Sequence, residues 1–323
     1  MILIVTNRAD VHVDELIKLA NKRGTDVFRL NAEDILTEYE YSISLSAEGR
    51  ASGKIVDSLG REFDLSKRQA AWFRKPSDDI THPSISPDFY TLVRSEANAL
   101  LETLYRWPNL HWVNCPLRAN SAKSKLQQLE FASKFDISVP ETIITNVSRK
   151  FLDFAKAHDW NCIVKAIYTG NFQINDRPAA IPTTEFSETH AKDISDRLSV
   201  CPTLAQPKIQ KSYELRVTVV GRKVFSVMID SQSNELTRVD WRPYTELCRH
   251  SVHELPNHIS QFCISFLDNF DLSFGAFDFI VDVGGEYIFL ECNPFGQYLW
   301  TEYETNLPIT EALLDHLTSL CSP

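Results

Sequence analysis

The chain has few glycines and lacks the short motifs by which several enzyme classes are recognised. Glycine occurs only ten times in 323 residues. No G-x-G-x-x-G follows the first apolar segment, which argues against a dinucleotide site there, and the absence of G-x-x-x-x-G-K-[ST] excludes a P-loop enzyme. No G-x-S-x-G nucleophile elbow occurs either. His253 and His258 are five residues apart with Pro256 between them, so they do not form an H-E-x-x-H zinc site.

Paired cysteines, long apolar runs and an excess of positive charge are also missing. The seven cysteines contain no C-x-x-C and are odd in number, which is typical of a protein from a reducing compartment. No apolar run approaches the length needed to span a membrane. Residues 1–6 have no basic region before them, so we expect a buried strand rather than a signal peptide, and a cytoplasmic protein. The net charge of −10 argues against a general nucleic-acid binder but leaves room for a local basic cleft.

The length of 323 residues predicts two or three domains, and 43% hydrophobic residues are ample for their cores. An apolar strand at residues 1–6, a helix over 13–23 and a strand over 26–30 form a β-α-β opening, which predicts an open parallel sheet. Beyond residue 115 hairpins of alternating pattern are separated by helices. We therefore expect an α/β domain followed by an α+β region.

The segment 272–302 predicts two strands joined by a tight turn. Gly284 and Gly285 read as a two-residue loop, and a loop of that kind fixes the register of a hairpin. In that register Val283 pairs with Glu286. Every pairing farther along the two strands follows from this one.

Two carboxylates then lie face to face within apolar strands. Asp278 is opposite Glu291, and Asn293 shares the face of Glu291, whereas Cys292 points to the other face and is expected in the core. Facing like charges are destabilising unless a cation lies between them, and oxygen ligands suit magnesium. The plain alternative is a solvated sheet face that carries acidic residues by chance.

Other charged residues need an explanation together with this pair. Lys165 lies within an apolar strand, Glu214 and Arg216 share one face of a hairpin strand, and Lys125 comes early in a helix that we expect Ser121 to cap. A triphosphate with magnesium would satisfy all of them. Taken singly, Lys125 reads as a surface residue and the Glu214–Arg216 pair as a cross-sheet ion pair.

The order of these features resembles the ATP-grasp superfamily. The resemblance rests on a lysine helix followed by VPET, on the strand IVKA, on QPKI followed by ELRVTVVG, and on GAFDFIV followed by FLECNP. More narrowly, AAWFRKP, VDWRP and ECNPFGQYLW resemble the maturases of microviridin-type peptides. These enzymes, the graspetide ligases, join side chains within a ribosomally made precursor peptide. The similarity covers almost the whole chain.

The resemblance implies a role for each residue at a matching position. The magnesium ligands would be Asp278, Glu291 and Asn293, with two ions expected. The ATP-binding residues would be Lys125 and Lys165 at the phosphates, Gln206, Lys208 and Ile209 at the adenine, and Glu214 at the ribose. The catalytic residues would be Arg216, Lys165 and Arg242, and the substrate side would hold Arg74, Asp240 and Trp241. One departure is the loop after Lys165, which has a single glycine, Gly170, where many ATP-grasp enzymes have several.

The resemblance also implies a fold, an activity and partners. We expect an α/β N-terminal (pre-ATP-grasp) domain at residues 1–115, an ATP-grasp lid subdomain at 116–205, and a C-terminal subdomain with the magnesium site at 206–323. Two antiparallel sheets would grip ATP. An Asp or Glu side chain of a precursor peptide would become an acyl phosphate and be joined to a Thr or Ser hydroxyl as an ester, or to a Lys amine as an amide.

The expected partner is a ribosomal precursor with a leader and a core, and the expected assembly is a homodimer, with no nucleic acid and no membrane. Two alternatives stay open. One is a RimK-like ligase of free amino acids or glutamate tails, which would share the ATP-site motifs. The other is a non-catalytic nucleotide- or peptide-binding protein with the same fold.

Overall fold

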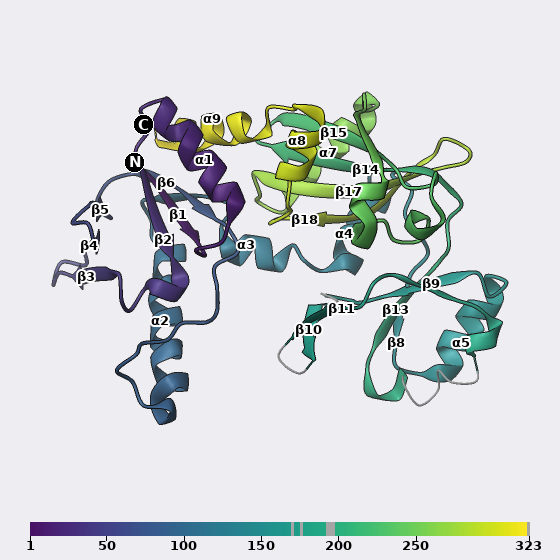
Figure 1. Ribbon diagram of the computed structural model, residues 1–323, viewed down its shortest axis with the longest axis horizontal. Helices are drawn as coiled ribbons and strands as arrows, with labels where there is room; N and C mark the ends of the chain where they lie inside the picture. The colour runs from purple at the N-terminus through teal and green to yellow at the C-terminus, as the bar shows by residue number, and fades with distance from the viewer. Residues whose placement is uncertain (169–170, 175–176, 192–197, 322–323) are drawn as a thin grey trace.

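The chain begins with a four-stranded parallel sheet in the order β2-β1-β6-β7 (Figure 1). The computed structural model describes residues 1–168, 171–174, 177–191 and 198–321. Ile2, Leu3, Ile4 and Val5 are completely buried, because helices cover both faces of a parallel sheet. The elements of this part are β1 Ile2–Thr6, α1 Val11–Lys22, β2 Val27–Asn31, β6 Gln69–Phe73, α2 Tyr90–Tyr105 and β7 Leu110–Val113. The predicted β-α-β opening is therefore confirmed.

A small antiparallel sheet, β3-β4-β5, lies between β2 and β6 in sequence and extends from one end of the molecule (Figure 1). Its strands are β3 Tyr39–Leu45, β4 Ala51–Asp57 and β5 Glu62–Asp64. Next along the chain after β7 come two short helices, α3 Pro116–Ser121 and α4 Lys125–Ser133. Ser121 thus ends a helix instead of capping one, and Ser124 occupies the N-cap position of α4.

The middle of the chain forms a four-stranded antiparallel sheet in the order β12-β9-β13-β8, which Figure 1 shows set apart from the other two large sheets. Phe151 and Ala155 of α5 pack on this sheet with Cys162 and Phe186. The elements are β8 Ile143–Thr145, α5 Ser148–Ala157, β9 Cys162–Lys165, β10 Asn171–Ile174, β11 Arg177–Ala180, β12 Thr184–Phe186 and β13 Thr203–Pro207.

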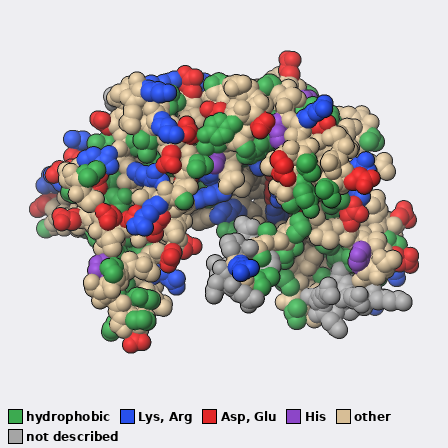
Figure 2. Space-filling view, viewed as in Figure 1, with side chains coloured by type: hydrophobic (Ala, Val, Ile, Leu, Met, Phe, Trp, Pro, Cys, Tyr) green, Lys and Arg blue, Asp and Glu red, His purple; other side chains and the backbone are tan. Residues whose placement is uncertain are grey.

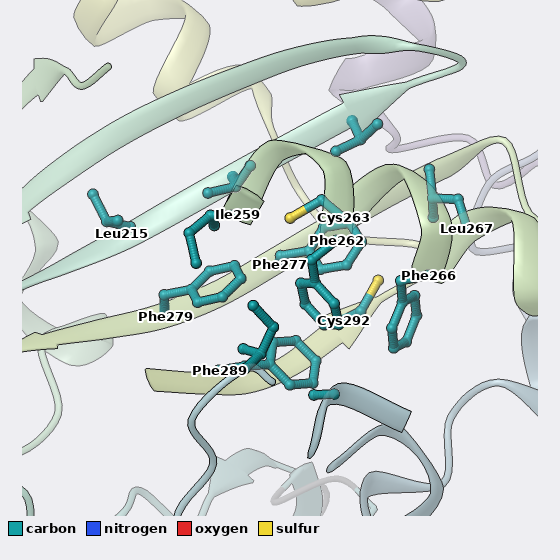
Figure 3. Close-up of a cluster of buried hydrophobic side chains, with 14 of the residues drawn as sticks. Leu215, Ile259, Phe262, Cys263, Phe266, Leu267, Phe277, Phe279, Phe289 and Cys292 are labelled. Carbon is teal, nitrogen blue, oxygen red and sulfur yellow. The ribbon is translucent and has the colours of Figure 1, made fainter. Parts of the chain in front are cut away.

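The last part is a five-stranded antiparallel sheet in the order β16-β15-β14-β17-β18. Its core is aromatic: Phe262 and Phe266 of α7 pack on Phe277 and Phe289, and Cys292 is buried beside them as predicted (Figure 3). The elements are β14 Lys211–Val220, β15 Lys223–Asp230, β16 Arg249–Val252, α7 Asn257–Asn269, β17 Phe274–Asp282, β18 Tyr287–Asn293, α8 Leu299–Thr305 and α9 Ile309–Cys321. The two antiparallel sheets expected of the α+β region are thus present.

The cores of the first and last sheets are continuous. Leu313 and Leu317 of α9 belong to one buried cluster with Ile4 and Trp72 of the first sheet and Phe274 of the last. Residues of α3 and α4 are buried with the last sheet as well. The C-terminal helix therefore fixes the first sheet against the last, whereas the middle sheet has a core of its own. Among the described residues, no helix is both long and apolar enough to cross a membrane.

Candidate active site

The two predicted carboxylates face each other in the last sheet. Asp278 on β17 pairs with Glu291 on β18, and Asn293 follows on the same strand, opposite Ala276. Both carboxylate side chains are 27% exposed, in a sheet whose other face is packed with phenylalanines. Both carboxylates are therefore partly accessible to solvent and lie outside the apolar core.

The turn that produces this register differs from the predicted one. The backbone N–H of Asp282 donates to Glu286 across a three-residue loop, and Gly285 takes a φ of +84°, so the predicted two-residue turn is wrong. A shift of register between Asp278 and Phe279 then compensates for the extra residue. A bulge in β18 thus restores the pairing of Asp278 with Glu291.

Each carboxylate has its own cation. Arg216 is the cross-strand partner of Asp278, with 3.2 Å between Nη1 and Oδ1, and Lys125 at the start of α4 contacts Glu291. Burial raises the pKa of Asp278 against the opposing effect of Arg216. Burial acts in the same direction on Glu291, but Lys125 and Lys165 outweigh it and lower the pKa of that carboxyl. Glu291 is thus the firmly ionised member of the pair.

Lys165 approaches this group from the middle sheet, at the end of β9. Its pKa is lowered to about 8, first by burial and then by repulsion from Lys125 and Arg242, against the attraction of Glu291. Figure 2 shows Lys and Arg side chains around a hollow in the centre of the drawn face. A half-buried lysine among other cations is stabilised by an anionic ligand, as predicted from the strand pattern.

Arg242 is held in the cleft by its neighbour Asp240. Its Nη2 lies 2.6 Å from Asp240 Oδ2, and the backbone N–H of Thr183 donates to the same oxygen at 3.0 Å. The hydrogen bond that Arg242 donates to Asp240, more than any other interaction, raises the pKa of Arg242. Asp240 thus joins the segment before β12 to the turn that carries Arg242, and it is 9% exposed.

Trp241 belongs to an aromatic cluster with Trp300 and His250. The ring centroids of Trp241 and Trp300 are 5.2 Å apart, and Trp241 is 8% exposed. Trp300 in turn presents its ring to Arg216, with 5.9 Å from the guanidinium carbon to the ring centroid. Trp300 was not predicted as a site residue, although it ends the NPFGQYLW stretch. The structure places Trp300, rather than Trp241, beside Arg216, the predicted catalytic arginine.

The predicted adenine hinge lies between the middle sheet and the last sheet, where β13 ends and β14 begins. Gln206 is buried and donates from Nε2 to Thr142 Oγ1 at 2.9 Å, Lys208 pairs with Glu185, and Ile209 is half-buried. These residues connect the two sheets between which the other predicted ATP residues lie.

The predicted ribose residue has a partner that sequence reasoning missed. Glu214 on β14 contacts the ammonium of Lys211, which also donates to the Val239 carbonyl at 3.3 Å. Both side chains are largely buried. Lys211 and Glu214 are three residues apart, a spacing that places two residues on opposite faces of a regular strand. The irregularity after Lys211 changes this, so the sequence did not reveal the pair.

Arg74 does not line the cleft, in contrast to the expectation of a substrate-side residue. Its side chain is 3% exposed and donates from Nη1 to the Phe295 carbonyl at 2.6 Å. Its other groups lie 3.1 Å from His12 Nδ1 and 3.4 Å from Asp10 Oδ2. Arg74 therefore fixes the loop after Asn293. Gly170, the single glycine of the predicted phosphate loop, lies outside the described residues.

That loop also explains why a glycine follows Phe295. A Cβ on Gly296 would lie 2.2 Å from the Cβ of Ala276, so only glycine lets the chain fold back over β17. The loop is closed further by the Phe295 N–H, which donates to Asn293 Oδ1 at 2.9 Å. The glycine in NPFG was a signal for this close approach.

The donor set around Asp278 fits magnesium. All its ligand atoms are oxygens, and within the described ranges no group of three or more His, Cys, Asp or Glu residues is arranged to hold a metal ion. Asp278, Glu291 and Asn293 would offer two carboxylates and one amide at this place. Magnesium is commonly held by one or two carboxylates together with the phosphates of a substrate.

Comparison with known proteins agrees with this geometry. No protein-family model matches the chain, and no curated protein matches it in sequence. A RiPP-associated ATP-grasp ligase of Chryseobacterium gregarium, solved in complex with ADP and a leader and core peptide, is 26% identical at a TM-score of 0.90, over 100% of this chain and 97% of its own. The macrocyclase MdnB of Microcystis aeruginosa is 26% identical at a TM-score of 0.79, over 98% of both chains.

A third structure supports the fold. The macrocyclase MdnC of Microcystis aeruginosa, solved with the precursor peptide MdnA, is 22% identical at a TM-score of 0.85, over 98% of this chain and 99% of its own. All three likenesses extend over nearly the full length of both chains. The chain therefore has the fold of the RiPP-associated ATP-grasp ligases, and the family resemblance predicted from its sequence is confirmed.

Proposed function

We propose that this protein is an ATP-dependent ligase that closes rings within a ribosomal precursor peptide. The observation that carries the proposal is the cleft in which Asp278 and Glu291 face each other among cations, within the fold of ligases of this kind. The net charge of the chain is −10, so a gathering of Lys and Arg side chains at one hollow is a local feature. It suits an anionic nucleotide together with an anionic substrate.

The reaction takes place in two displacements. A side-chain carboxylate of an Asp or Glu in the peptide attacks the γ-phosphorus of ATP, so that a C–O–P linkage forms and ADP leaves. A Thr or Ser hydroxyl, or a Lys amine, then attacks the acyl carbon and displaces phosphate, which gives an ester or an amide. The protein supplies positioning and charge stabilisation and needs no covalent nucleophile.

Arg216 is well placed to stabilise charge on the transferring group. One guanidinium nitrogen is held by Asp278, while its buried Nε has no hydrogen-bond partner among the described residues. A buried donor without a partner is costly, and a phosphoryl or carboxylate oxygen would satisfy it. Lys125, Lys165 and Arg242 add positive charge for the phosphates. The segment from Gln206 to Ile209 would contact the adenine, and Glu214 the ribose once Lys211 releases it.

Asp278, Glu291 and Asn293 would hold magnesium, with two ions in the complete site. Magnesium would offset the repulsion between the negatively charged carboxylate and ATP. The Asn293 amide oxygen accepts from Phe295 N, which orients it, and an amide oxygen has a second lone pair for a further partner. The chain's own task is to hold these oxygens in place on adjacent strands.

The proposal extends to assembly. The partner is a precursor peptide with a leader and a core, as in the complex of the C. gregarium ligase. The active form would be a homodimer in the cytoplasm. The predicted boundaries at residues 115 and 205 would separate an N-terminal domain, a lid and a C-terminal subdomain, with α3 and α4 attached to the last of these by their shared core.

The test is to incubate the purified protein with ATP, magnesium and the acidic peptide encoded beside its gene. Each linkage removes the elements of one water molecule from the peptide, which mass spectrometry resolves, and each consumes one ATP. Treatment with mild base then distinguishes an ester from an amide, since mild base hydrolyses only the ester and so restores the mass of the lost water.

Two results would contradict the proposal in different ways. Turnover of ATP with free amino acids, and without any loss of water from a peptide, would indicate an amino-acid or glutamate-tail ligase. Binding of ATP without turnover under any of these conditions would indicate a non-catalytic protein with the same fold.

A further inference from the structure

Lys75 lies where the first sheet meets the loop after the metal site. The residue before it, Arg74, continues the parallel pairing through its N–H to the Val5 carbonyl at 2.8 Å and holds the Phe295 carbonyl with its side chain. Phe295 in turn donates its N–H to Asn293. Two hydrogen bonds therefore connect the end of β6 with a proposed magnesium ligand, and Lys75 is the next residue of the chain.

The backbone at Lys75 is held in a conformation that its sequence disfavours. Its φ is +43°, in the left-handed region that side chains other than glycine avoid, and Pro76 after it favours extended backbone. The side-chain amide of Asn7 donates to the Lys75 carbonyl at 2.7 Å and secures this arrangement. The chain thus turns sharply at the end of the strand, and the Lys75 side chain is exposed while that of Arg74 is buried.

The charge on Lys75 is uncompensated. The two arginines of the cleft wall have carboxylate partners, Arg216 with Asp278 and Arg242 with Asp240. Among residues 1–168, 171–174, 177–191 and 198–321, no carboxylate lies within ion-pair distance of the Lys75 ammonium. Surrounding protein and then Arg74 lower the pKa of Lys75 to about 8, with a smaller contribution from Arg216 in the same direction and an opposing one from Asp10. The effect of Arg216 agrees with the hydrogen bonds from Arg74 to Phe295 and from Phe295 to Asn293, which bring the end of β6 to the loop after the cleft carboxylates.

We propose that Lys75 binds the peptide carboxylate that is to be activated, and that it does so together with Arg216. The inference rests on the proposed function and names the group that selects its acidic substrate. Lys165 ends a strand of the middle sheet, whereas Lys75 follows β6 of the first sheet, and neither has a carboxylate at ion-pair distance in the described part of the chain. In this proposal the two lysines serve different anions. Lys165 serves the nucleotide and Lys75 the carboxylate. The role that the resemblance suggested for Arg74 thus belongs to its neighbour.

The first experiment separates the two substrates kinetically. In Lys75→Gln we expect kcat/KM for the precursor peptide to fall at least tenfold, while KM for ATP and the melting temperature stay as in the wild type. Lys75→Arg keeps the charge and should recover most of the loss. Lys67→Gln, on the same domain and exposed, is the matched control and should behave as the wild type. An unchanged kcat/KM for the peptide in Lys75→Gln, or an equal loss for ATP, would overturn the inference.

A second measurement does not require turnover. Lysines of the wild-type protein are acetylated with acetic anhydride in the presence of ADP and magnesium, with and without the precursor peptide, and each site is quantified by mass spectrometry. The acidic peptide should protect Lys75 several-fold, and a peptide with Asn and Gln in place of its Asp and Glu should not. Equal protection by both peptides, or none, contradicts the role of Lys75. A failure of the proposed function has a different signature, because the wild type would then remove no water from the peptide.

Discussion

Two groups of charged residues lie near the loop that follows Asn293, and they differ in how their charges are paired. The anchor cluster, Asp10, His12 and Arg74, is less than 8% exposed, and its members bind one another, the Phe295 carbonyl and the backbone of α8. The cleft group consists of Asp278, Glu291, Arg216 and Lys165. Its two carboxylates face each other across adjacent strands and remain partly exposed.

The difference shows which buried charges are structural. In the anchor cluster every charge meets an opposite charge or a backbone group, so no ligand is needed. The Nε of Arg74 makes no hydrogen bond among the described residues, but it lies 3.4 Å from Asp10 Oδ2. In the cleft two like charges are adjacent, the Nε of Arg216 also has no hydrogen-bond partner in the described ranges, and Lys165 has a lowered pKa. Burial alone therefore does not indicate a functional site, whereas burial with incomplete pairing does.

The largest effect is expected at Glu291. Glu291→Gln removes the firmly ionised ligand but keeps the shape of the side chain, so ATP turnover with the peptide should fall by about a thousandfold or more. Release of phosphate measures the rate, and circular dichroism verifies the fold. Glu286→Gln is the control on the same hairpin, since the Glu286 side chain is exposed and accepts a hydrogen bond from Ser138 Oγ at 2.6 Å. Wild-type turnover in Glu291→Gln would show that the cleft pair is as structural as the anchor cluster.

Arg74 tests the other side of the comparison. Arg74→Leu leaves Asp10 buried without its cation, so the free energy of unfolding should fall by about 3–5 kcal/mol. Urea denaturation measures the change. Arg222→Leu is the control, because the Arg222–Asp268 pair is exposed on both sides and should contribute almost nothing. If Arg74→Leu kept its stability and lost only peptide turnover, Arg74 would be the substrate residue that the sequence resemblance suggested.

The pairing of the two carboxylates was predicted correctly from the sequence, but the turn from which it was predicted was wrong. The pairing of Asp278 with Glu291 is correct although the turn is not, because the three-residue loop and the bulge of β18 cancel. The bulge breaks the alternation of β18, because Phe289 and Cys292 lie in the same core although they are three residues apart. The residues before Glu291 are apolar at every position, so the break could not be recognised from the sequence pattern. The apolar periodicity of the strands was sufficient for the sheets themselves, since burial on one or both faces determines it.

The burial of Arg74 could not be predicted for a different reason. A motif shows that two cations end a strand, but not which of them is satisfied. The partners of Arg74 are His12 and Phe295, which lie 62 and 221 residues away in the sequence. Only the folded chain brings them together. Contacts of this range also place Trp300 beside Arg216, which a motif ending in tryptophan did not reveal.

Trp300 connects the two groups, because it lies on α8, whose first residues the anchor cluster holds, and presents its ring to Arg216. A cation–π contact of a partly desolvated arginine contributes about 1–2 kcal/mol, so Trp300→Leu should lower kcat about tenfold and Trp300→Phe much less. Tyr303→Leu, on the same helix but exposed, should leave kcat unchanged. Equal rates in Trp300→Leu and the wild type would show that Arg216 is oriented by Asp278 alone.

The smallest effect concerns His12 and its protonation. Burial lowers the pKa of His12, with Arg74 and Lys75 acting in the same direction and Asp10 against them. Its Nε2 accepts from the Tyr298 N–H at 3.2 Å, an arrangement that requires the neutral ring. The unfolded chain therefore binds this proton more readily than the folded one. Folding stability should decline as the pH falls below about 6.5, by at most about 1.4 kcal/mol per pH unit.

The comparison of wild type with His12→Gln isolates this contribution, because the other histidines with lowered pKa values, His250, His253 and His316 among them, are present in both proteins. Glutamine keeps an oxygen that can accept from Tyr298 but does not titrate. Urea unfolding at pH 7.5, 6.5 and 5.5 should therefore give a flatter dependence in His12→Gln than in the wild type. Parallel curves would mean that the anchor cluster accommodates a proton at little cost. In that case the pairing of charges in the anchor cluster would not depend on a neutral His12 ring.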